Sequence, residues 1–302
     1  MSPDIAASVR QRLLETIRRT GEDASFVWSR YAVERLLYRL SVSEHSRDFV
    51  LKGAALFVVW TGQPHRPTLD LDLLGRGEDS SGRMVDVFRT VCRAEVVPDG
   101  LRFDADSVSA APIRGGQEYG GQRVALTAFL GKARIPVRVD VGFGDAVTPR
   151  PRTVTYPTLL DFPAPRLGAC PRETVVAEKL HAMVVLGIAN SRMKDFYDLH
   201  VLASAFSFDG ATLARAVQAT FERRRTALPG EMPLALTAQF GHDATKQTQW
   251  RAFLRRSALD DVPEDLASVV AALAAFTGPV LTSLAQGNRF EMAWPPGGPW
   301  GE

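Results

Sequence analysis

The sequence has few of the features that mark a special class of protein. It contains two cysteines in 302 residues, Cys92 and Cys170, which cannot build a disulfide framework, and no Cys/His spacing resembles a zinc site. The formal net charge is only +2, which is too small to indicate a nucleic-acid binder by charge alone. We therefore expect an ordinary globular protein of about two domains.

Targeting and membrane signals are also missing. The start, Met1-Ser2-Pro3-Asp4, lacks the basic residues and the apolar run of a signal peptide. The longest apolar stretches are far short of the roughly 18 residues needed to cross a bilayer. From these two absences we expect a cytoplasmic protein that does not associate with a membrane.

The first half of the chain alternates between helical and strand patterns. Apolar residues at helical spacing predict helices over residues 5–20, from about residue 25, and over 84–92. A short apolar strand is predicted over 49–51, and Gly53 then turns the chain into an apolar helix over 54–60. Strict alternation over 68–74 predicts a strand, and further strands are predicted between residues 101 and 130.

The second half begins with one more alternating strand and then becomes helical. Over residues 135–141, Arg138 and Asp140 lie on the face opposite three valines. The proline-rich residues 149–171 predict a segment that crosses between two lobes, and residues 294–300 predict an irregular tail. We therefore predict an α/β (α+β) lobe over residues 1–168, with a mixed sheet and flanking helices, and a mostly helical lobe over 169–302.

The strongest chemical signal is the pair Asp70 and Asp72. Alternate side chains of a strand project from the same face about 6.5–7 Å apart. Two carboxylates so placed can share a Mg²⁺ ion, which prefers oxygen ligands and keeps waters for substrate phosphates. The alternative is a solvent-facing strand edge that carries two acids without function.

Asp140 is a second signal, because Asp is disfavoured within strands. If its strand neighbours that of Asp70 and Asp72, three carboxylates lie together and need cations to neutralise them. The alternative is that Asp140 pairs with Arg138 or with another arginine across the sheet.

The turn at Lys52-Gly53-Ala54 is a third signal, since it follows a strand and opens a helix. A glycine at such a turn allows backbone N–H groups to approach a phosphate. The alternative is an ordinary turn glycine.

Taken together, a glycine turn into a helix, an Asp-x-Asp strand and a third Asp resemble the polymerase-β-like nucleotidyltransferase fold. More narrowly, Lys52-Gly53-Ala54-Ala55-Leu56 with Arg66-x-Thr68-x-Asp70-x-Asp72 resembles the AbiEii/AbiGii toxin family, which includes the MenT toxins. Two later segments extend the resemblance, Glu178-Lys179-Leu180-His181-Ala182 and Arg192-x-Lys194-Asp195-x-x-Asp198-Leu199. The match spans roughly residues 49–200, and it departs from the family pattern at Ala54, where the family has a second glycine or a serine.

The resemblance assigns roles to named residues. It implies that Asp70, Asp72 and Asp140 bind metal and, with Lys179 and Asp195, form the catalytic group, and that the C-terminal lobe completes the active-site cleft. It also implies that the nucleotide is contacted by a larger set: Lys52, Gly53, Ala54, Arg66, Thr68, Lys179, Arg192 and Lys194. Ala54 keeps its backbone N–H but offers no hydroxyl to a phosphate.

For the residues of the two later motifs, the sequence also leaves more than one role open. Lys179 lies inside an apolar helical stripe, so it either extends to solvent or faces an anion. We expect Asn190-Ser191 to cap a helix whose first turn holds Arg192 and Lys194, where an acid or a phosphate must balance them. Asp195 and Asp198 are either catalytic or structural partners of these cations.

The function implied by the resemblance is Mg²⁺-dependent, or Mn²⁺-dependent, transfer of a nucleotide from an NTP to the 3′ end of tRNA. Such a protein is the toxin of a pair with a cognate antitoxin. The alternatives are modification of a small hydroxylated molecule or of a protein side chain, and a non-catalytic nucleotide-binding interaction protein.

Other conspicuous residues predict structural roles. His181 and His200 suggest polar packing, the two cysteines suggest inert positions, and Trp250 and Phe253 suggest core packing. The run Arg223-Arg224-Arg225 predicts a solvated helix end. An RNA-facing patch that joins this run to Arg251, Arg255 and Arg256 is the alternative.

Overall fold

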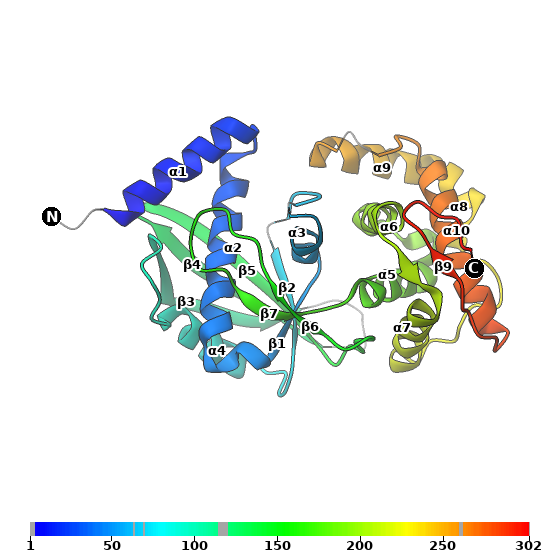
Figure 1. Cartoon of the computed structure of the whole chain (residues 1–302), viewed down its shortest axis with the longest axis horizontal. Coiled ribbons are helices and arrows are strands. Elements are labelled where there is room, and N and C mark those ends of the chain that lie inside the picture. Colours follow the sequence, from blue (N-terminus) through cyan, green and yellow to red (C-terminus); the bar gives the residue numbers. More distant parts are fainter. Residues whose placement is uncertain (1–3, 63, 69, 114–119, 260–261, 302) are drawn as a thin grey trace. The chain divides into compact units, whose positions relative to one another are not determined.

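The computed structural model describes residues 4–62, 64–68, 70–113, 120–259 and 262–301, and it divides into two compact units (Figure 1). The first unit comprises Met1–Asp145 and Arg152–Ala169, and the second comprises Ala146–Pro151 and Cys170–Glu302. The segment Ala146–Pro151, placed in the first lobe by the sequence pattern, belongs to the second unit. It is tied there by Thr174, whose hydroxyl accepts the N–H of Thr148 at 3.0 Å and donates to its carbonyl at 2.8 Å.

The first unit is a mixed sheet with helices packed on it. Its helices are α1 (Ile5–Thr20), α2 (Ala24–Val42), α3 (Ala55–Thr61) and α4 (Ser81–Arg93), with a 3-10 helix at Glu44–Arg47. Its strands are β1 (Phe49–Lys52), β2 (Asp70–Gly75), β3 (Leu101–Pro112), β4 (Gly121–Leu130), β5 (Ala133–Phe143), β6 (Arg152–Thr155) and β7 (Arg166–Ala169). The order is β3-β4-β5-β2-β1-β7-β6, in which β2–β5 and β1–β7 are parallel and the other pairs antiparallel.

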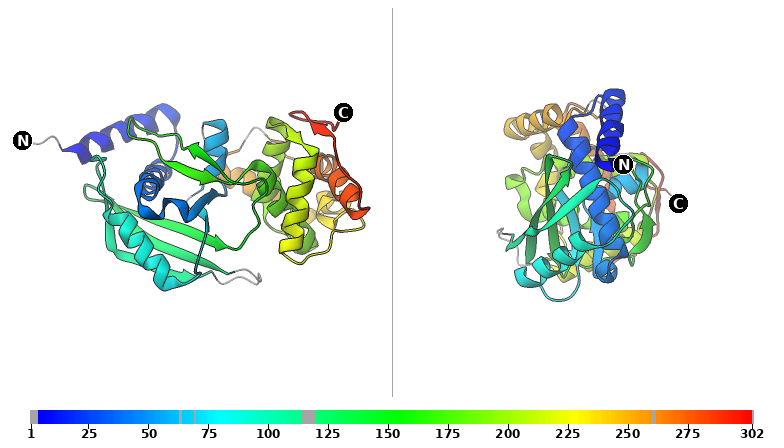
Figure 2. Two further views of the ribbon diagram at one scale, coloured as in Figure 1. Left: turned by 60° about the horizontal axis from the view of Figure 1, so that its bottom comes forward. Right: turned by 90° about the vertical axis from the view of Figure 1, so that its left-hand side faces the viewer.

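The alternation in β5 separates a core face from a polar face. Val137, Val139 and Val141 are buried, whereas Arg138 is exposed and Asp140 is partly exposed. Helices α2 and α4, which contact each other and the sheet, lie on one face of it (Figure 2). The sequence prediction of a mixed sheet with flanking helices is confirmed.

Residues 149–171 pass between the two units, as predicted, because Pro151 and Cys170 belong to the second unit and Arg152–Ala169 to the first, but most of the range is part of the sheet. Strands β6 and β7 lie in this range and extend the sheet, with β7 parallel to β1 and Leu167 and Ala169 buried. Each strand has only four residues, which is too short for a period of two to stand out between prolines.

The second unit is mostly helical, as predicted. Its elements are α5 (Arg172–Leu186), α6 (Met193–Ala205), α7 (Gly210–Arg223), α8 (Ala238–His242), α9 (Ala244–Ser257) and α10 (Leu266–Ala285), with 3-10 helices at Gly187–Ala189 and Leu234–Leu236 and a two-stranded ribbon of β8 (Phe208–Asp209) and β9 (Ala293–Trp294). Helix α10 contacts α6, α7, α8 and α9 and so forms the centre of this unit.

Helix α10 also corrects the statement that no apolar stretch is long enough to span a bilayer. By length and composition alone it could cross a membrane. Counting strictly apolar runs missed it because uncharged Ser, Thr, Gly and Pro interrupt its hydrophobic residues. Leu273 and Phe276 are fully buried within the unit, and a buried core helix passes the same test of length and composition.

Residues 294–300, predicted as an irregular tail, are packed into the core of the second unit. The indole N–H of Trp294 donates to the carbonyl of Ala203 at 2.7 Å, and that of Trp300 donates to the carbonyl of Phe276 at 2.8 Å. Both indole rings pack against the ring of Phe276. Two Trp side chains bury enough apolar surface to order a segment that is otherwise rich in Pro and Gly.

Helix α2 carries buried charges that its helical pattern does not reveal. Asp99 accepts hydrogen bonds from Arg35 at 3.0 Å and from Arg39, and all three side chains are almost completely buried. Burial alone would raise the pKa of Asp99, but the two guanidinium groups outweigh it and lower the pKa. Glu34, buried beside Arg35, accepts the N–H of Leu159 at 2.7 Å, and burial raises its pKa to about 7.

The raised pKa of Glu34 makes the stability of the fold pH-dependent. The native protein holds this proton up to about pH 7, whereas the unfolded chain releases it near pH 4.5, so the stabilisation is present at low pH and is lost as the pH rises through 7. Relative to Glu34→Gln, we expect the unfolding free energy of the wild type to fall by about 2–3 kcal/mol from pH 5 to pH 8. Urea unfolding of both proteins at both pH values measures this difference, and parallel pH profiles would contradict it.

Candidate functional site

A row of charged side chains crosses four neighbouring strands of the first unit. The register pairs Lys52 on β1 with Asp72 on β2, Asp72 with Asp140 on β5, and Asp140 with Arg123 on β4. Side chains directly opposite each other project from the same face of a sheet. Two carboxylates therefore stand side by side with a cation at each end of the row.

Asp70 lies next to this row, two residues before Asp72 on the same face of β2. Its carboxylate oxygen Oδ1 is buried and has no hydrogen-bond partner within the described part of the chain. A buried carboxylate oxygen without a partner is costly, unless a cation completes its surroundings when bound. The hydroxyl of Thr68 donates to the carbonyl of Asp70 at 3.3 Å and so contacts the backbone at the start of the strand.

Gly53 approaches Asp72 more closely than any other residue type could. Its φ is +66°, in the left-handed region, and a Cβ at this position would lie 2.6 Å from Cγ of Asp72. The next residue, Ala54, is buried and precedes α3, which has only seven residues. Because α3 is so short, its dipole gives no reason to place a ligand at this turn. The turn belongs to the candidate site because it lies against the Asp72 carboxylate.

Lys52 has a partner that the sequence analysis missed. Its Nζ lies 2.7 Å from Oδ2 of Asp145, and both side chains are largely buried. Asp145 follows β5 in an irregular segment, where no periodic pattern could reveal it. Arg66, another predicted nucleotide contact, lies half-buried between α3 and β2.

Arg123 is the second residue of the candidate site that sequence reasoning missed. Its Nε and Nη2 donate to the two oxygens of Asp140 at 2.8 and 2.7 Å. The hydrogen bond and the charge of Asp140 raise the pKa of Arg123, and the charges of Asp70 and Asp72 add to this rise. Two interpretations of Asp140 were open, a cluster of carboxylates that needs cations and an ion pair with an arginine. The structure shows the ion pair, and the partner is Arg123 on the neighbouring strand rather than Arg138.

The structure thus brings Asp70, Asp72 and Asp140 onto one face of the sheet. The carboxylate of Asp140, however, is already bound to Arg123. In the described ranges no group of three or more His, Cys, Asp or Glu side chains is arranged to hold a metal ion. Mg²⁺ commonly takes only one or two carboxylates and completes its shell with waters and substrate phosphates. The unpartnered oxygen of Asp70, two residues from the Asp72 carboxylate on the same face of β2, fits a site of that kind.

In the second unit, Lys179 on α5 is held by two aspartates of α6. Its Nζ lies 2.6 Å from Oδ1 of Asp195 and 2.8 Å from Oδ2 of Asp198. Burial alone would lower the pKa of Lys179, but the two negative charges outweigh it and raise the pKa. Both aspartates are buried, so the structural pairing that the sequence left open is present, and Lys179 remains protonated at neutral pH.

The two other predicted nucleotide contacts of this unit are exposed. Arg192 and Lys194 are solvent-accessible, and neither forms an ion pair in the part of the chain that the structure describes. The helix starts at Met193, so Arg192 precedes it instead of lying in its first turn. Asn190 does act locally, because its side-chain oxygen accepts the N–H of Arg192 at 2.9 Å.

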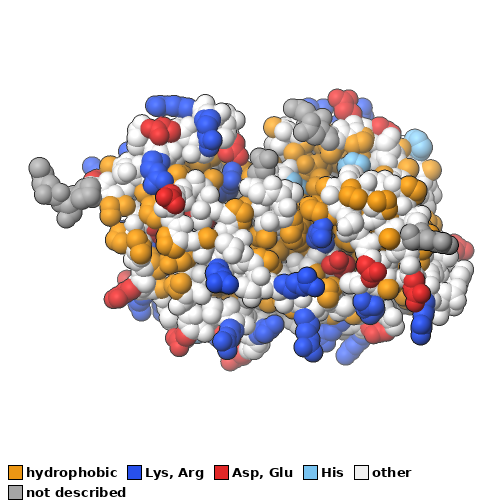
Figure 3. Space-filling model, in the orientation of Figure 1, with side chains coloured by type: hydrophobic (Ala, Val, Ile, Leu, Met, Phe, Trp, Pro, Cys, Tyr) orange, Lys and Arg blue, Asp and Glu red, His pale blue; other side chains and the backbone are white. Residues whose placement is uncertain are grey.

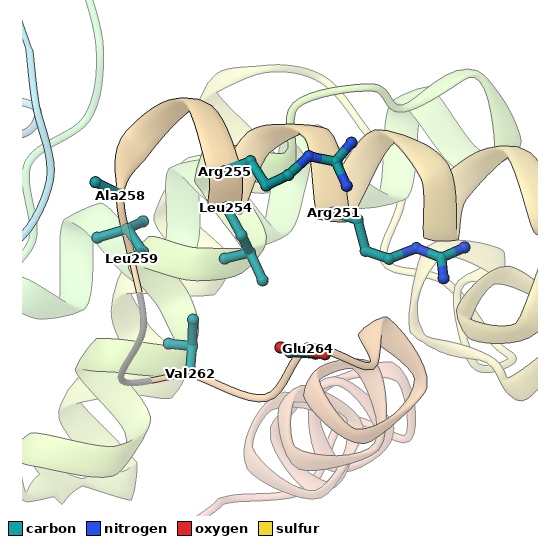
Figure 4. Close-up of a pocket in the computed structure, with 7 residues that line it drawn as sticks. All are labelled: Arg251, Leu254, Arg255, Ala258, Leu259, Val262 and Glu264. Atoms are coloured by element: carbon teal, nitrogen blue, oxygen red, sulfur yellow. The ribbon is translucent and has the colours of Figure 1, made fainter.

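Part of the possible RNA-facing patch lines a pocket of about 510 Å³ (Figure 4). Arg251 and Arg255 extend from α9 on one side, and Glu264 lies opposite them before α10. Leu254, Leu259 and Val262 give the pocket an apolar wall. On the face shown in Figure 3, basic and acidic side chains are interspersed rather than gathered in separate patches.

Most residues predicted to be structural behave as expected, but His200 departs from its predicted polar packing, because its Nδ1 is buried without a hydrogen-bond partner in the described part of the chain. His181 contacts the hydroxyl of Thr226 at 2.8 Å and packs edge-on against Phe221. Trp250 and Phe253 are buried. Cys92 is buried and unbridged, and burial raises the pKa of its thiol to about 12, which leaves it unreactive at neutral pH.

The close approach of Gly53 to Asp72 predicts a specific sensitivity to substitution. Gly53→Ala combines a left-handed backbone with a clash, whereas Gly21→Ala has a similar φ of +71° and open space around the new Cβ. We expect Gly21→Ala to destabilise by about 1–2 kcal/mol. Gly53→Ala should destabilise by about 1–3 kcal/mol more, because the side chain must displace Asp72. Urea unfolding of the two variants measures this, and equal losses would refute the clash.

The Lys179 cluster predicts that its lysine is required for stability. Lys179→Ala leaves two buried carboxylates without their cation, so we expect the unfolding free energy to fall by about 3–5 kcal/mol. Lys194→Ala, which removes an exposed lysine about one helical turn from Asp198, should change it by no more than about 0.5 kcal/mol. If denaturant unfolding gives the two variants equal stability, the cluster is not a structural element.

Comparison with known proteins places the chain in a family. Two solved structures from Helicobacter pylori are similar at 13% identity and a TM-score of 0.48, each over 88% of this chain. One is described as JHP933, with 95% of its chain covered, and the other as a candidate nucleotidyltransferase, with 98% covered. No protein with a curated function matches. The sequence model described as "Nucleotidyl transferase AbiEii toxin, Type IV TA system" matches residues 35–274. Because this match covers most of the sequence, the chain belongs to the AbiEii family of nucleotidyltransferase toxins from type IV toxin–antitoxin systems.

Proposed function

We propose that this nucleotidyltransferase moves a nucleotide from an NTP to the 3′ end of tRNA, with a divalent ion held by Asp70 and Asp72. The observation that carries the proposal is the Asp70–Asp72 pair, with one buried oxygen of Asp70 unpartnered and the Gly53 backbone directly beside Asp72. Family membership supplies the reaction class and implies a cognate antitoxin. The tRNA acceptor and the requirement for Mg²⁺ are our own inferences from the resemblance of the motifs.

The residues of the first unit have distinct tasks in this reaction. Asp70 and Asp72 hold the ion, and Mg²⁺ (or Mn²⁺) when bound neutralises phosphate charge and lowers the pKa of the attacking hydroxyl. The backbone at Gly53, which lies against the Asp72 carboxylate, and the N–H of Ala54 are the phosphate contacts that we propose for the turn. Lys52, Arg66 and Thr68 are the further nucleotide contacts that we propose for this unit.

Asp140 has two possible tasks, as a ligand of a second ion or as the base that accepts the proton of the acceptor hydroxyl. Its bidentate pair with Arg123 favours neither, because a carboxylate bound to a guanidinium is a weaker base and a weaker ligand.

For the second unit we propose that Lys179 and the exposed Arg192 and Lys194 contact the triphosphate. Asp195, and Asp198 with it, orients the Lys179 ammonium group. Because we expect Lys179 variants to be destabilised, loss of activity in such a variant counts only where the protein remains folded.

The acceptor is proposed as tRNA because exposed arginines of α9 offer phosphate contacts: Arg251, Arg255 and Arg256. A protein that acts on tRNA works where tRNA is, so we propose a cytoplasmic location. Modification of a small hydroxylated molecule or of a protein side chain is the alternative that the same metal site would also support.

The direct test is transfer of label from each of four α-labelled NTPs onto total tRNA in the presence of Mg²⁺. We expect label on tRNA with one or two of the NTPs and a loss of about 100-fold or more in Asp70→Asn. Asp86→Asn, which changes an exposed aspartate on α4, is the matched control and should keep full activity.

Each outcome separates the alternatives. If Asp70→Asn keeps full activity, the proposed metal site is wrong. If tRNA stays unlabelled while the protein still binds NTP with Mg²⁺, the acceptor is wrong and the search moves to small molecules and proteins.

A further inference from the structure

Arg123 has more hydrogen-bond donors than its ion pair with Asp140 uses. A guanidinium group carries five N–H bonds in one plane. The pair uses the side edge of the group, formed by Nε and one N–H of Nη2, at 2.8 and 2.7 Å from the two carboxylate oxygens. The end edge, formed by Nη1 and the second N–H of Nη2, is directed away from Asp140. It has no partner in the described ranges, and the side chain is 49% exposed.

Asp140 holds this guanidinium group in place. The register sets the two residues directly opposite each other on β5 and β4, and a bidentate pair fixes both the position and the plane of the group. A donor that is already fixed loses little conformational freedom when a ligand binds to it. The end edge can bind two oxygens of one phosphate group in the same way as the side edge binds the carboxylate.

The end edge of Arg123 is also close to the other two acids of the site. Asp72 is the neighbour of Asp140 in the register, and Asp70 lies two residues away on the same face of β2. The charges of Asp70 and Asp72 contribute to the raised pKa of Arg123, so the guanidinium group is within their electrostatic reach. A phosphate group bound through an ion at these aspartates would therefore come near Arg123.

Two other cations on this face are less suited to the same contact. Lys52, at the other end of the row, has its Nζ 2.7 Å from Oδ2 of Asp145 and is largely buried. Arg138 is exposed opposite Asp70, but no carboxylate in the described ranges holds its side chain in one position. Of these three cations, Arg123 is the one that combines exposure with a fixed guanidinium group.

We propose that Arg123 is a further nucleotide contact of the site, with its side edge held by Asp140 and its end edge bound to a phosphate group of the NTP. The proposal rests on the nucleotidyl transfer proposed above. The ion pair need not open for this contact, because the pair uses only the side edge. Asp140 then has a task besides the two considered for it, since it orients the guanidinium group.

The test is the affinity for NTP analogues that have a methylene group between the α- and β-phosphates, which bind but cannot donate their nucleotide. The four analogues are titrated with Mg²⁺ into the full-length protein by calorimetry, and the one with the highest affinity is used for the variants. Arg123→Lys keeps the charge but loses the planar fork, so its dissociation constant should be about tenfold higher than that of the wild type. A value within about twofold of the wild type would show that only charge matters and would overturn the proposal.

A double variant removes the pair without a change in net charge. Arg123→Gln/Asp140→Asn loses one positive and one negative group, so long-range electrostatics predicts little change in affinity. The lost phosphate contact should instead raise the dissociation constant about tenfold, and an unchanged value would contradict the contact.

Asp140→Asn by itself removes a negative charge but keeps the guanidinium group. It should therefore change the dissociation constant by less than about threefold. A loss as large as that in Asp70→Asn would make Asp140 a ligand of the ion instead of the residue that holds Arg123, and would overturn the proposal.

A matched control is available on the same sheet. Arg134→Lys makes the same substitution at an exposed position on β5, six residues or about 20 Å from Asp140. It should leave the affinity within about twofold of the wild type. A tenfold loss here as well would show that the change from arginine to lysine acts without contact to the nucleotide, which refutes the assignment.

The remaining outcomes distinguish this inference from the proposed function. If the wild type binds none of the four analogues, the proposed function fails and the inference fails with it. If the wild type binds an analogue and Arg123→Lys binds it equally well, only the inference fails. Total tRNA, measured by filter binding without nucleotide, should bind Arg123→Lys within about twofold of the wild type, and a loss confined to tRNA would assign the contact to the acceptor and not to the NTP. Arg123→Lys alone decides the question if the double variant does not fold.

Discussion

The register between the parallel strands β2 and β5 is the constraint on which the candidate site depends. It places Asp72 beside Asp140 and, through the neighbouring strands, aligns Lys52 and Arg123 at the two ends of the row. Because side chains alternate between faces, a shift of one residue would move the acids into the core and the leucines and valines to the surface. The burial of Leu71, Leu73, Val139 and Val141 therefore maintains the register on which the carboxylate pair depends.

Carboxylates elsewhere in the chain are balanced in a different way. Asp99 is enclosed by Arg35 and Arg39 in the first unit, and Asp195 and Asp198 enclose Lys179 in the second. Removing one partner from such a cluster leaves a buried charge, so these groups support the fold. Asp70 differs because one of its oxygens is buried without a partner in the described ranges. That difference, more than the number of acids, distinguishes a site that can receive a cation from a structural ion cluster.

Much of the local structure could be predicted from periodicity. The alternation around Asp70 and Asp140 predicted β2 and β5, and helical spacing predicted α1, α2 and α4. The four-residue strands β6 and β7 were missed because they are too short for alternation to stand out and, unlike β1, contain no apolar run. The C-terminal segment was misread because Pro and Gly obscured two tryptophans that pack on Phe276. Arg35 and Arg39 lie on a helix whose apolar residues were recognised, but only the distant Asp99 explains why they are buried.

The sequence by itself determined the types of the longer elements, the faces on which the aspartates lie, and, through its motifs, the family. These properties depend on residues close together in the chain, where backbone geometry converts spacing into direction. The tertiary structure alone decided which charges meet: Arg123 with Asp140, Lys52 with Asp145, and Lys179 with both Asp195 and Asp198. Each pair joins different elements or an element and a distant loop. Several arginines and lysines could have reached each carboxylate, and only the packed sheet and helices select one.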